Sequence, residues 1–341
     1  MKINWSILIL MVTVSSGICQ TGGESIFQIL NLAPSSRTLA LGNRLVSLRD
    51  SDVTLAQINP ALAQQYVTHQ VAFNHSFYYT GSSFSTFSTT YHLAKQNITL
   101  IGGLQSLRHS EIQGADDFGN KTNTFTSSEN LILFGASKKL FDQLNIGVNF
   151  KYILSTIESY NANGLAMDIG GLFNFNNQLQ NIGITIKNLG SQFKSYQIDK
   201  ENLPFDILVG YSQRLAHVPI RFSISAHHLT TWNLRTILPE EQSLGFGEIP
   251  KEASVLSRTI DNLFRHLVFS NEIYLGKYAP IRLRISYDHQ RHQELKDQTY
   301  RGLSGFGGGI GIKFSKFVVD YGFANYHLAG SINALGISYR W

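Results

Sequence analysis

Histidine is the residue type of this chain that most suggests chemistry, because an imidazole can ligate a metal ion or move a proton near neutral pH. Three places bring histidines beside one another or beside acids: His227 with His228, His289 with His292, and His109 ahead of Glu111, Asp116 and Asp117. Adjacent residues of a regular strand point to opposite faces, so His227 and His228 should not ligate one ion together. A helical loop would bring His289 and His292 onto one side, but no third ligand is implied. We therefore expect no metal site and no cofactor.

Enzyme motifs are a second source of chemistry, and the sequence offers little for them. A serine hydrolase needs a serine activated by a base, and no Gly-x-Ser-x-Gly elbow occurs. The glycines between 305 and 311 open a segment of strand type rather than a helix, so no helix N-terminus awaits a phosphate there. Relief of crowding against another segment explains them better. We expect a protein without catalytic activity.

Charged side chains on the polar faces of alternating segments are more informative. They are Lys151, Lys187, Arg214, Arg221, Arg282, Arg284, Asp168, Asp206, Asp288 and Asp320. If these faces enclose an interior, the charges should pair with one another and with Arg37, Arg44, Arg49, Asp50 and Asp52 of the N-terminal region, because an unpaired charge away from bulk water is costly. Such pairs would fix the N-terminal region in place. A charged conduction path is the functional alternative.

The elements that would position these charges are β-strands. From about residue 67 onward, apolar and polar residues alternate in runs of about ten, with the period of two that is typical of a strand. In 281–287, for example, isoleucine, leucine, isoleucine and tyrosine alternate with arginine, arginine and serine. Fourteen such runs occur, from 69–79 to 330–341. The sequence therefore predicts an all-β fold of fourteen antiparallel strands.

A β-sandwich would alternate too, but three features favour a transmembrane barrel. Only 15% of the residues are charged, and no stretch after residue 18 has the roughly 18–20 apolar residues of a membrane helix. Tight links alternate with longer ones such as 109–127, 156–163, 191–203 and 291–303, as the two ends of a barrel require. The last strand ends on Trp341, an aromatic residue on its apolar face. Outer-membrane barrels characteristically end in such a strand, which their assembly machinery recognises.

The N-terminal region does not belong to this pattern. Lys2, the apolar stretch 5–14 and the small residues before Gln20 indicate a signal peptide over 1–19. A lipoprotein anchored through Cys19 is the alternative, and the large Ile18 before it disfavours that cleavage. Residues 20–66 form turns and short helices and are predicted to plug a barrel that spans 67–341; a periplasmic extension is the alternative. The net charge of +5 is too small to indicate a nucleic-acid partner.

Several segments of the chain resemble the PorQ family of outer-membrane barrels, which belongs to the type IX secretion system of the Bacteroidetes. In chain order they are Asn31–Gly42, Asp52–Leu62, Leu203–Phe205, Ala226–Leu229, Asp261–Phe269, Tyr287–Arg291 and Phe323–Gly330. The triplet Asn59-Pro60-Ala61 also resembles the hatch signature of the wider FadL-like group, whose members are fourteen-stranded barrels with an N-terminal plug.

The resemblance implies a non-enzymatic component of the outer membrane. It would hold a PorZ-like surface protein, beside PorU- and PorV-like components, in a complex that attaches secreted cargo to anionic lipopolysaccharide. The alternative is a FadL-like transporter of a hydrophobic small molecule. A transporter would need an apolar pocket near the plug and a lateral opening in a strand, and no run of inward-facing apolar residues clearly favours one.

The 230–264 loop is the best candidate for binding a partner. It carries Glu240 and Glu241, and then apolar residues at helical spacing: Ala253, Leu256, Ile260, Leu263 and Phe264. This spacing predicts an amphipathic helix of about three turns. A loop of this length usually has a function. We expect it to lie outside the membrane and to dock the PorZ-like partner; a lid over the barrel mouth is the alternative.

Overall fold

The computed structural model describes residues 25–116, 118–175, 179–197, 199–235, 255–276, 280–295, 303–327 and 330–341. The predicted signal peptide, Glu240, Glu241 and Ala253 lie outside the described residues.

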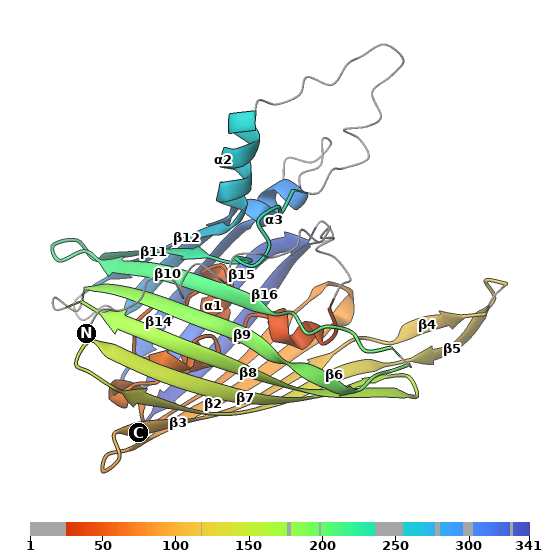
Figure 1. Cartoon of the computed structure of the whole chain (residues 1–341), viewed down its shortest axis with the longest axis horizontal. Helices are drawn as coiled ribbons and strands as arrows, with labels where there is room; N and C mark the ends of the chain where they lie inside the picture. The colour runs from red at the N-terminus through yellow and green to blue at the C-terminus, as the bar shows by residue number, and fades with distance from the viewer. Residues whose placement is uncertain are drawn as a thin grey trace, which may run out of the picture.

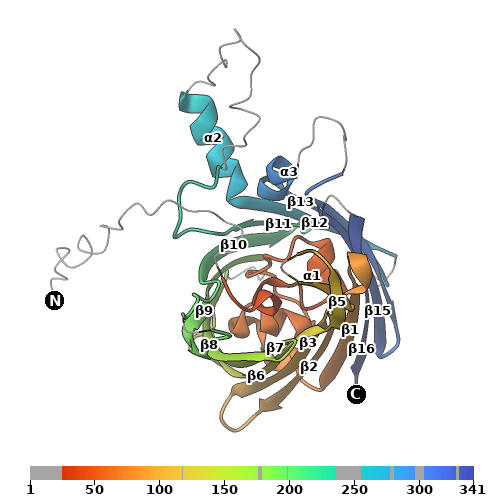
Figure 2. The same ribbon diagram turned by 90° about the vertical axis from the view of Figure 1, so that its right-hand side faces the viewer.

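Fourteen strands form one closed barrel, and each of them pairs antiparallel with its neighbours (Figures 1 and 2). They are β1 (Gln70–Phe77), β2 (Ser83–Leu93), β3 (Ile98–Arg108), β6 (Ser127–Lys139), β7 (Leu144–Ile157), β8 (Tyr160–Asn174), β9 (Gln180–Lys194), β10 (Asp206–Arg214), β11 (Ile220–Ala226), β12 (Leu267–Leu275), β13 (Ile281–Asp288), β14 (Phe306–Phe314), β15 (Phe317–His327) and β16 (Gly330–Arg340). The barrel closes where β1 pairs with β16, with Gln70 opposite Arg340. The predicted fourteen-stranded antiparallel barrel is confirmed.

The alternation of side chains sorts residues between the outside and the inside of this barrel. On β7, Phe150 is 60% exposed on the outer face, whereas its neighbours Asn149 and Lys151 are almost completely buried. On β13, Ile285 is 52% exposed, and Arg284 and Ser286 are buried. A period of two gives this result when one face meets lipid and the other meets a filled interior.

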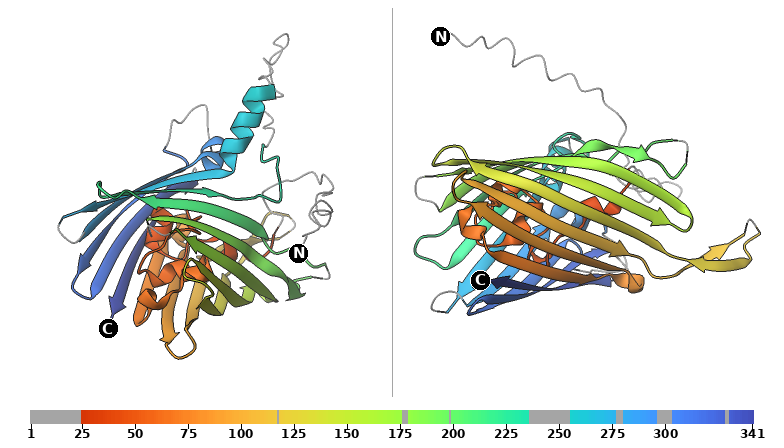
Figure 3. Two further views of the ribbon diagram at one scale, coloured as in Figure 1. Left: turned by 60° about the vertical axis from the view of Figure 1, so that its left-hand side comes forward. Right: turned by 90° about the horizontal axis from the view of Figure 1, so that it is seen from below.

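Two links differ from the prediction. The 156–163 link is not a long loop, because β7 and β8 stay paired as far as Ile157 and Tyr160. Their outer ends are polar, which hides the alternation there; Thr156, for example, donates a hydrogen bond to Asn161. The 109–127 loop contains a separate hairpin of β4 (Ile112–Ala115) and β5 (Lys121–Phe125), which extends past the end of the barrel (Figure 3).

The N-terminal residues 25–69, called the luminal segment below, lie inside the barrel (Figure 2). Their short helices are η2 (Gln28–Asn31), α1 (Ser36–Ala40), η3 (Val53–Gln57), η4 (Pro60–Leu62) and η5 (Gln65–Val67). A further turn, η6 (Tyr79–Gly81), links β1 to β2. Inward-facing hydroxyl groups of the barrel satisfy carbonyl groups of the luminal segment: Ser270 donates to Leu41, and Ser286 donates to Ala40, both at 2.9 Å.

Glycines let the barrel wall approach the luminal segment closely. A Cβ atom at Gly309 would lie 2.8 Å from the Cβ of Ala40 in α1, and one at Gly307 would lie 3.2 Å from the Ala40 carbonyl oxygen. Gly307 and Gly309 therefore relieve crowding against the luminal segment, whereas a Cβ at Gly305, Gly308 or Gly311 would meet atoms of the barrel or of the α3 region.

Two helices lie at the end of the barrel that carries the longer loops. Helix α2 (Val255–Arg265) precedes β12 and projects away from the barrel rather than across its opening (Figures 1 and 2). Helix α3 (His289–Glu294) follows β13 directly. Among the described residues, no helix is both long enough and apolar enough to cross a membrane.

Candidate functional site

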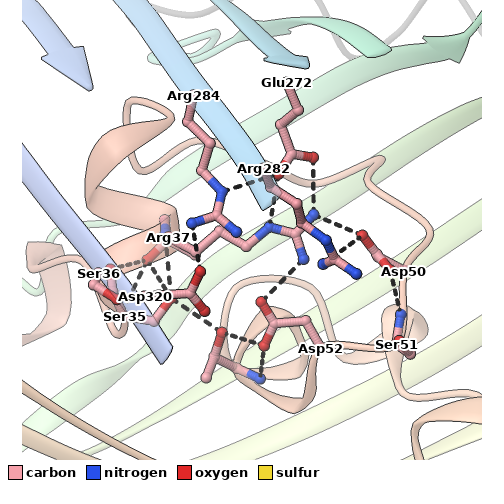
Figure 4. Close-up of polar contacts among 12 residues, drawn as sticks. Ser35, Ser36, Arg37, Asp50, Ser51, Asp52, Glu272, Arg282, Arg284 and Asp320 are labelled. Atoms are coloured by element: carbon pink, nitrogen blue, oxygen red, sulfur yellow. Dashed lines mark hydrogen bonds and ion pairs between the residues drawn. The ribbon is translucent and has the colours of Figure 1, made fainter. Parts of the chain in front are cut away.

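The most concentrated chemistry in the structure is a network of buried charges that joins the luminal segment to the barrel wall (Figure 4). Arg37 of α1 lies at its centre and is 1% exposed. Its guanidinium group contacts Glu272 of β12 through two bonds, Nε to Oε1 at 3.0 Å and Nη2 to Oε2 at 2.8 Å. It also contacts Asp50 at 2.7 Å and Asp52 at 3.2 Å within the luminal segment. A two-pronged pair of this kind fixes both distance and orientation.

Three further arginines complete the network from the barrel wall. Arg221 of β11 lies 3.1 Å from Asp50 and 3.3 Å from Glu272. Arg284 of β13 lies 3.1 Å from Glu272 and also contacts Asp320 of β15, while Arg282 lies 3.7 Å from Asp50. Four arginines therefore face four carboxylates, and each charge has an opposite partner. A buried network needs this balance, because an uncompensated buried charge is strongly destabilising.

Acid should weaken this network through Asp50. Burial disfavours its ionised form, but the nearby Arg37, Arg221 and Arg282 outweigh burial and hold the pKa of Asp50 well below its ordinary value of 3.8. A lowered carboxyl pKa contributes stability above the unfolded value and loses it as the pH falls through the folded value. We expect the luminal segment to stay protected at pH 7 and at pH 5, and to lose protection progressively as the pH falls below the ordinary carboxyl value. Amide hydrogen exchange followed by mass spectrometry, with the intrinsic pH dependence of exchange corrected, measures this, and equal corrected protection at pH 2 and pH 5 would contradict it.

A second buried pair lies on the neighbouring part of the wall. The Lys151 ammonium contacts Asp168 at 2.6 Å and donates a hydrogen bond to the side-chain oxygen of Asn188 at 3.0 Å. Asp168 in turn accepts from the backbone N–H of Asn188 at 2.9 Å. These contacts tie β7, β8 and β9 together inside the barrel and involve no charge of the luminal segment.

The turn at Asn59 is the other fixed point of the luminal segment. The Asn59 side chain caps η4 by accepting a hydrogen bond from the N–H of Ala61 at 3.0 Å. Its amide group donates to the carbonyls of Val46 at 2.6 Å and of Gly171 in β8 at 3.2 Å. Pro60 occupies the first helical position, where its missing N–H is not needed. The triplet thus joins the luminal segment to the wall through the side-chain amide of Asn59.

At the long-loop end, a cavity of about 760 Å³ opens among the luminal segment, β9, β10 and α3. It is lined by Arg44, Lys187, Asp206 and His228 among other residues. Arg44 is buried, and it forms no ion pair within the described part of the chain. The expected pairing of Arg44 with a wall charge is therefore not seen there. Arg49 stacks over the ring of Tyr66 at 5.2 Å.

Other predicted residues have local structural roles. Asp288 does not pair with a charge of the luminal segment; it caps α3 by accepting from the N–H of Arg291 at 3.1 Å. The reason is that β13 ends at Asp288, beyond the region that α1 fills. Trp341 is half exposed and extends the barrel seam, because its N–H donates to the His69 carbonyl at 3.1 Å.

The structure places His227 and His228 differently from the expectation for a regular strand. Strand β11 ends at Ala226, and His228 has a left-handed backbone with φ of 53°. Because the chain turns there, both imidazoles approach Asp206. Burial and the nearby Arg44 lower the pKa of His227 well below 6.5 and that of His228 to about 4, so both rings are neutral at pH 7. The geometric part of the prediction was wrong because it assumed a strand beyond its end.

Helix α2 confirms the predicted amphipathic helix and has an unusual orientation. Its polar side makes the contacts with the barrel mouth: Asp261 accepts from His289 at 3.1 Å, and Asn262 accepts from the N–H of Leu234 at 3.0 Å. Its apolar residues, by contrast, are exposed: Leu256, Ile260, Leu263 and Phe264. In a soluble protein the apolar side of a surface helix packs inward, whereas this side of α2 is not covered by any of the described residues.

Glu272 is the central residue that the sequence did not identify. It follows Asn271, and two adjacent polar residues interrupt the alternation of apolar and polar residues. The sequence therefore does not show which of the two faces the interior. The signal that could have found it is the register, since Ser270 and Tyr274 lie on the same buried face.

Comparison with known proteins finds likeness in the fold. No protein-family model matches the chain, and no curated protein matches its sequence. Among solved structures, a deletion mutant of the monoaromatic hydrocarbon channel TodX is similar with a TM-score of 0.56 at 10% identity, over 92% of this chain and 99% of that one. The monoaromatic hydrocarbon channel CymD has a TM-score of 0.53 at 10% identity, over 92% and 99%. The toluene transporter TodX of Pseudomonas putida has a TM-score of 0.51 at 10% identity, over 89% and 96%.

These neighbours are FadL-family outer-membrane barrels. At 10% identity the likeness concerns the architecture, which in this chain is a closed fourteen-stranded sheet. The chain therefore has the fold of a FadL-like outer-membrane β-barrel.

Proposed function

We propose that this chain is a non-enzymatic outer-membrane component of the type IX secretion system that anchors a PorZ-like surface protein, beside PorU- and PorV-like components of the attachment complex. The order of the segments that resemble the PorQ family, from Asn31–Gly42 to Phe323–Gly330, supports the identity. The structural observation that carries the anchoring role is the exposed apolar side of α2.

Helix α2 has the properties of a docking element. Leu256 and Ile260 are 70% and 47% exposed, one turn apart on the same side of the helix. Asp261 on the other side contacts His289 of α3 and Arg235, which holds the helix in a fixed direction at the mouth. A rigid helix that displays apolar residues is ready to enter a groove of a partner without a large ordering cost.

The filled interior supports an anchor as well. Buried ion pairs and hydrogen bonds hold the luminal segment, and the residues around Arg37 are charged rather than apolar. An anchor needs a stable body, and a luminal segment held by these buried contacts suits it.

Replacing Leu256 and Ile260 by glutamate should abolish docking. Each change removes an apolar contact that contributes roughly 1.5–3 kcal/mol when buried, so we expect at least a tenfold loss in recovery of the PorZ-like partner. Co-purification from membranes in mild detergent measures this. Leu229→Glu is the matched control, because Leu229 is an exposed leucine of the mouth outside α2. Undiminished recovery with a correctly folded Leu256→Glu/Ile260→Glu barrel would refute the docking role.

A FadL-like transporter of a hydrophobic small molecule is the second candidate, and the structural comparisons favour it over a role in secretion. The similar solved structures are called hydrocarbon channels or a toluene transporter, and their architecture covers nearly the whole chain. The cavity at the mouth has a mixed lining: charged and amide groups such as Arg44, Lys187 and Asn188 lie beside apolar residues such as Leu203 and Phe205, so it does not decide between the two candidates.

One genetic experiment separates the two candidates. Disruption of the gene should detach secreted cargo from the cell surface if the chain is an anchor, while uptake of a hydrophobic solute such as toluene stays unchanged. Loss of uptake with normal surface attachment would select the transporter instead.

A further inference from the structure

A group of potential metal ligands that neither candidate function uses lies at the mouth cavity: Asp206 and His228 line it, and His227 is buried beside them. Asp206 begins β10, and His227 and His228 directly follow β11. We propose that Asp206, His227 and His228 form a binding site for a divalent transition-metal ion of the zinc type.

The distances suit a single ion. One ligand atom from each of the three residues lies within 4.8 Å of the others, and Nδ1 of His228 lies 3.7 Å from Oδ2 of Asp206. Neighbouring ligand atoms around tetrahedral zinc are separated by about 3.3 Å. Side-chain rotations that move the ligand atoms by about an ångström therefore close the site. Two imidazoles and a carboxylate are a ligand set that zinc and similar borderline metals accept.

Two members of this group are buried with polar atoms that lack a hydrogen-bond partner among the described residues. His227 is 1% exposed, and neither of its ring nitrogens has such a partner within the part of the chain that the structure describes. Oδ2 of Asp206 is also buried without one, whereas its Oδ1 accepts from the N–H of His228 at 2.7 Å. A buried polar group left without a partner costs roughly 1–3 kcal/mol, and such groups are rare in native proteins. A bound cation would satisfy both residues together.

The backbone holds the ligands in place. The N–H of His227 donates to the His266 carbonyl at 3.0 Å, and Nδ1 of His266 lies 2.8 Å from the His227 carbonyl. The left-handed conformation of His228 then turns its ring back toward Asp206. These contacts fix two ligands before any ion arrives, as a preorganised site requires.

The residues around the proposed metal site determine which fourth ligand the ion would take. Asp206 and His228 line the 760 Å³ cavity, so the site is open to a water molecule or an anion from that side. Arg44 and Lys187 line the same cavity and oppose a bare cation, because they carry like charge. Their charge favours an anionic fourth ligand over water. Three protein ligands with one open position are the arrangement of exchangeable zinc sites.

Metal titration of the full-length protein in detergent tests the proposal. After treatment with EDTA and dialysis, we expect the protein to bind about one Zn²⁺ per chain, and Co²⁺ to give the visible absorption of a tetrahedral site. His227→Gln and Asp206→Asn should each weaken binding about a hundredfold or more. His289→Gln is the matched control, because His289 also contacts an acid of the mouth, Asp261, at 3.1 Å, and it should bind like the wild type.

Folding of each variant is checked separately by the heat-dependent shift of the barrel on electrophoresis. His228→Gln provides a second test, since this side chain is partly exposed and tolerates substitution better than His227. No Zn²⁺ bound by the wild type at 100-fold excess would overturn the proposal. Wild-type affinity in folded His227→Gln or His228→Gln would overturn it too.

Discussion

Arg37→Met should release the luminal segment from the barrel wall. Arg37 contacts Glu272, Asp50 and Asp52 at once, and it is the only arginine of the four-arginine network that the luminal segment supplies. Methionine keeps much of the volume and removes the charge. Breaking a buried ion pair from one side costs about 3–5 kcal/mol, because the remaining carboxylates stay buried with too few partners.

Limited trypsin digestion measures this release. In the wild type Arg44 is buried and Arg49 is only partly accessible, so we expect slow cleavage; in Arg37→Met we expect cleavage at both positions at least tenfold faster. Lys139→Met is the matched control. Lys139 pairs with Asp142 on an exposed turn, where screening by water leaves an ion pair little effect on stability. Equal protection of Arg37→Met and Lys139→Met would contradict the role of the network.

The same variant tests whether the luminal segment blocks the barrel. If it does, Arg37→Met should conduct ions in planar bilayers where the wild type does not. The double variant Arg37→Met/Glu272→Gln removes both partners of the two-pronged pair. We expect it to lose less stability than the sum of the two single variants, because it leaves no unpaired charge between these positions.

The sequence predicted the barrel well because its strands obey a simple physical rule. Lipid outside and a filled interior force a period of two, and this pattern survives in nearly every strand. The pattern failed where the environment changes. The outer ends of β7 and β8 pass beyond the apolar belt, so their polar residues resemble a loop although the hydrogen-bond ladder continues.

The candidate site was less predictable, because it depends on contacts between distant parts of the chain. Arg37 and Glu272 are 235 positions apart, and their pairing requires both α1 inside the barrel and the register of β12. His228 shows a different limit: a single left-handed residue after β11 reverses the direction of a side chain. Pattern rules assume regular backbone, and they cannot locate the residue at which regularity ends.

Gly183→Ala should distort the luminal segment at its second point of attachment. A Cβ atom at Gly183 of β9 would lie 2.0 Å from the carbonyl oxygen of Val46 and 2.5 Å from its carbonyl carbon. These are backbone atoms, so no side-chain rotation relieves the clash. The same carbonyl accepts the amide hydrogen bond of Asn59 at 2.6 Å, and a displaced Val46 therefore loses this bond.

The expected cost combines the two effects. Overpacking contributes about 1–3 kcal/mol, and the loss of a buried hydrogen bond adds about 1 kcal/mol, so Gly183→Ala should destabilise the protein by about 2–4 kcal/mol. Urea unfolding in detergent, followed by tryptophan fluorescence, gives the free energy of unfolding.

A neighbouring glycine on the other face of the wall provides the control. A Cβ atom at Gly171 of β8 meets only the Cγ2 atom of Ile184, at 3.2 Å, and that side chain lies on the exposed outer face, where it can move. Gly171→Ala should change stability by less than about 1 kcal/mol, since alanine also suits a strand better than glycine. If both variants lost the same stability, the close approach of the luminal segment to β9 would not be what requires glycine at position 183. A large loss in Gly183→Ala alone, accompanied by faster trypsin cleavage after Arg44, would place the attachment at Val46 and Asn59.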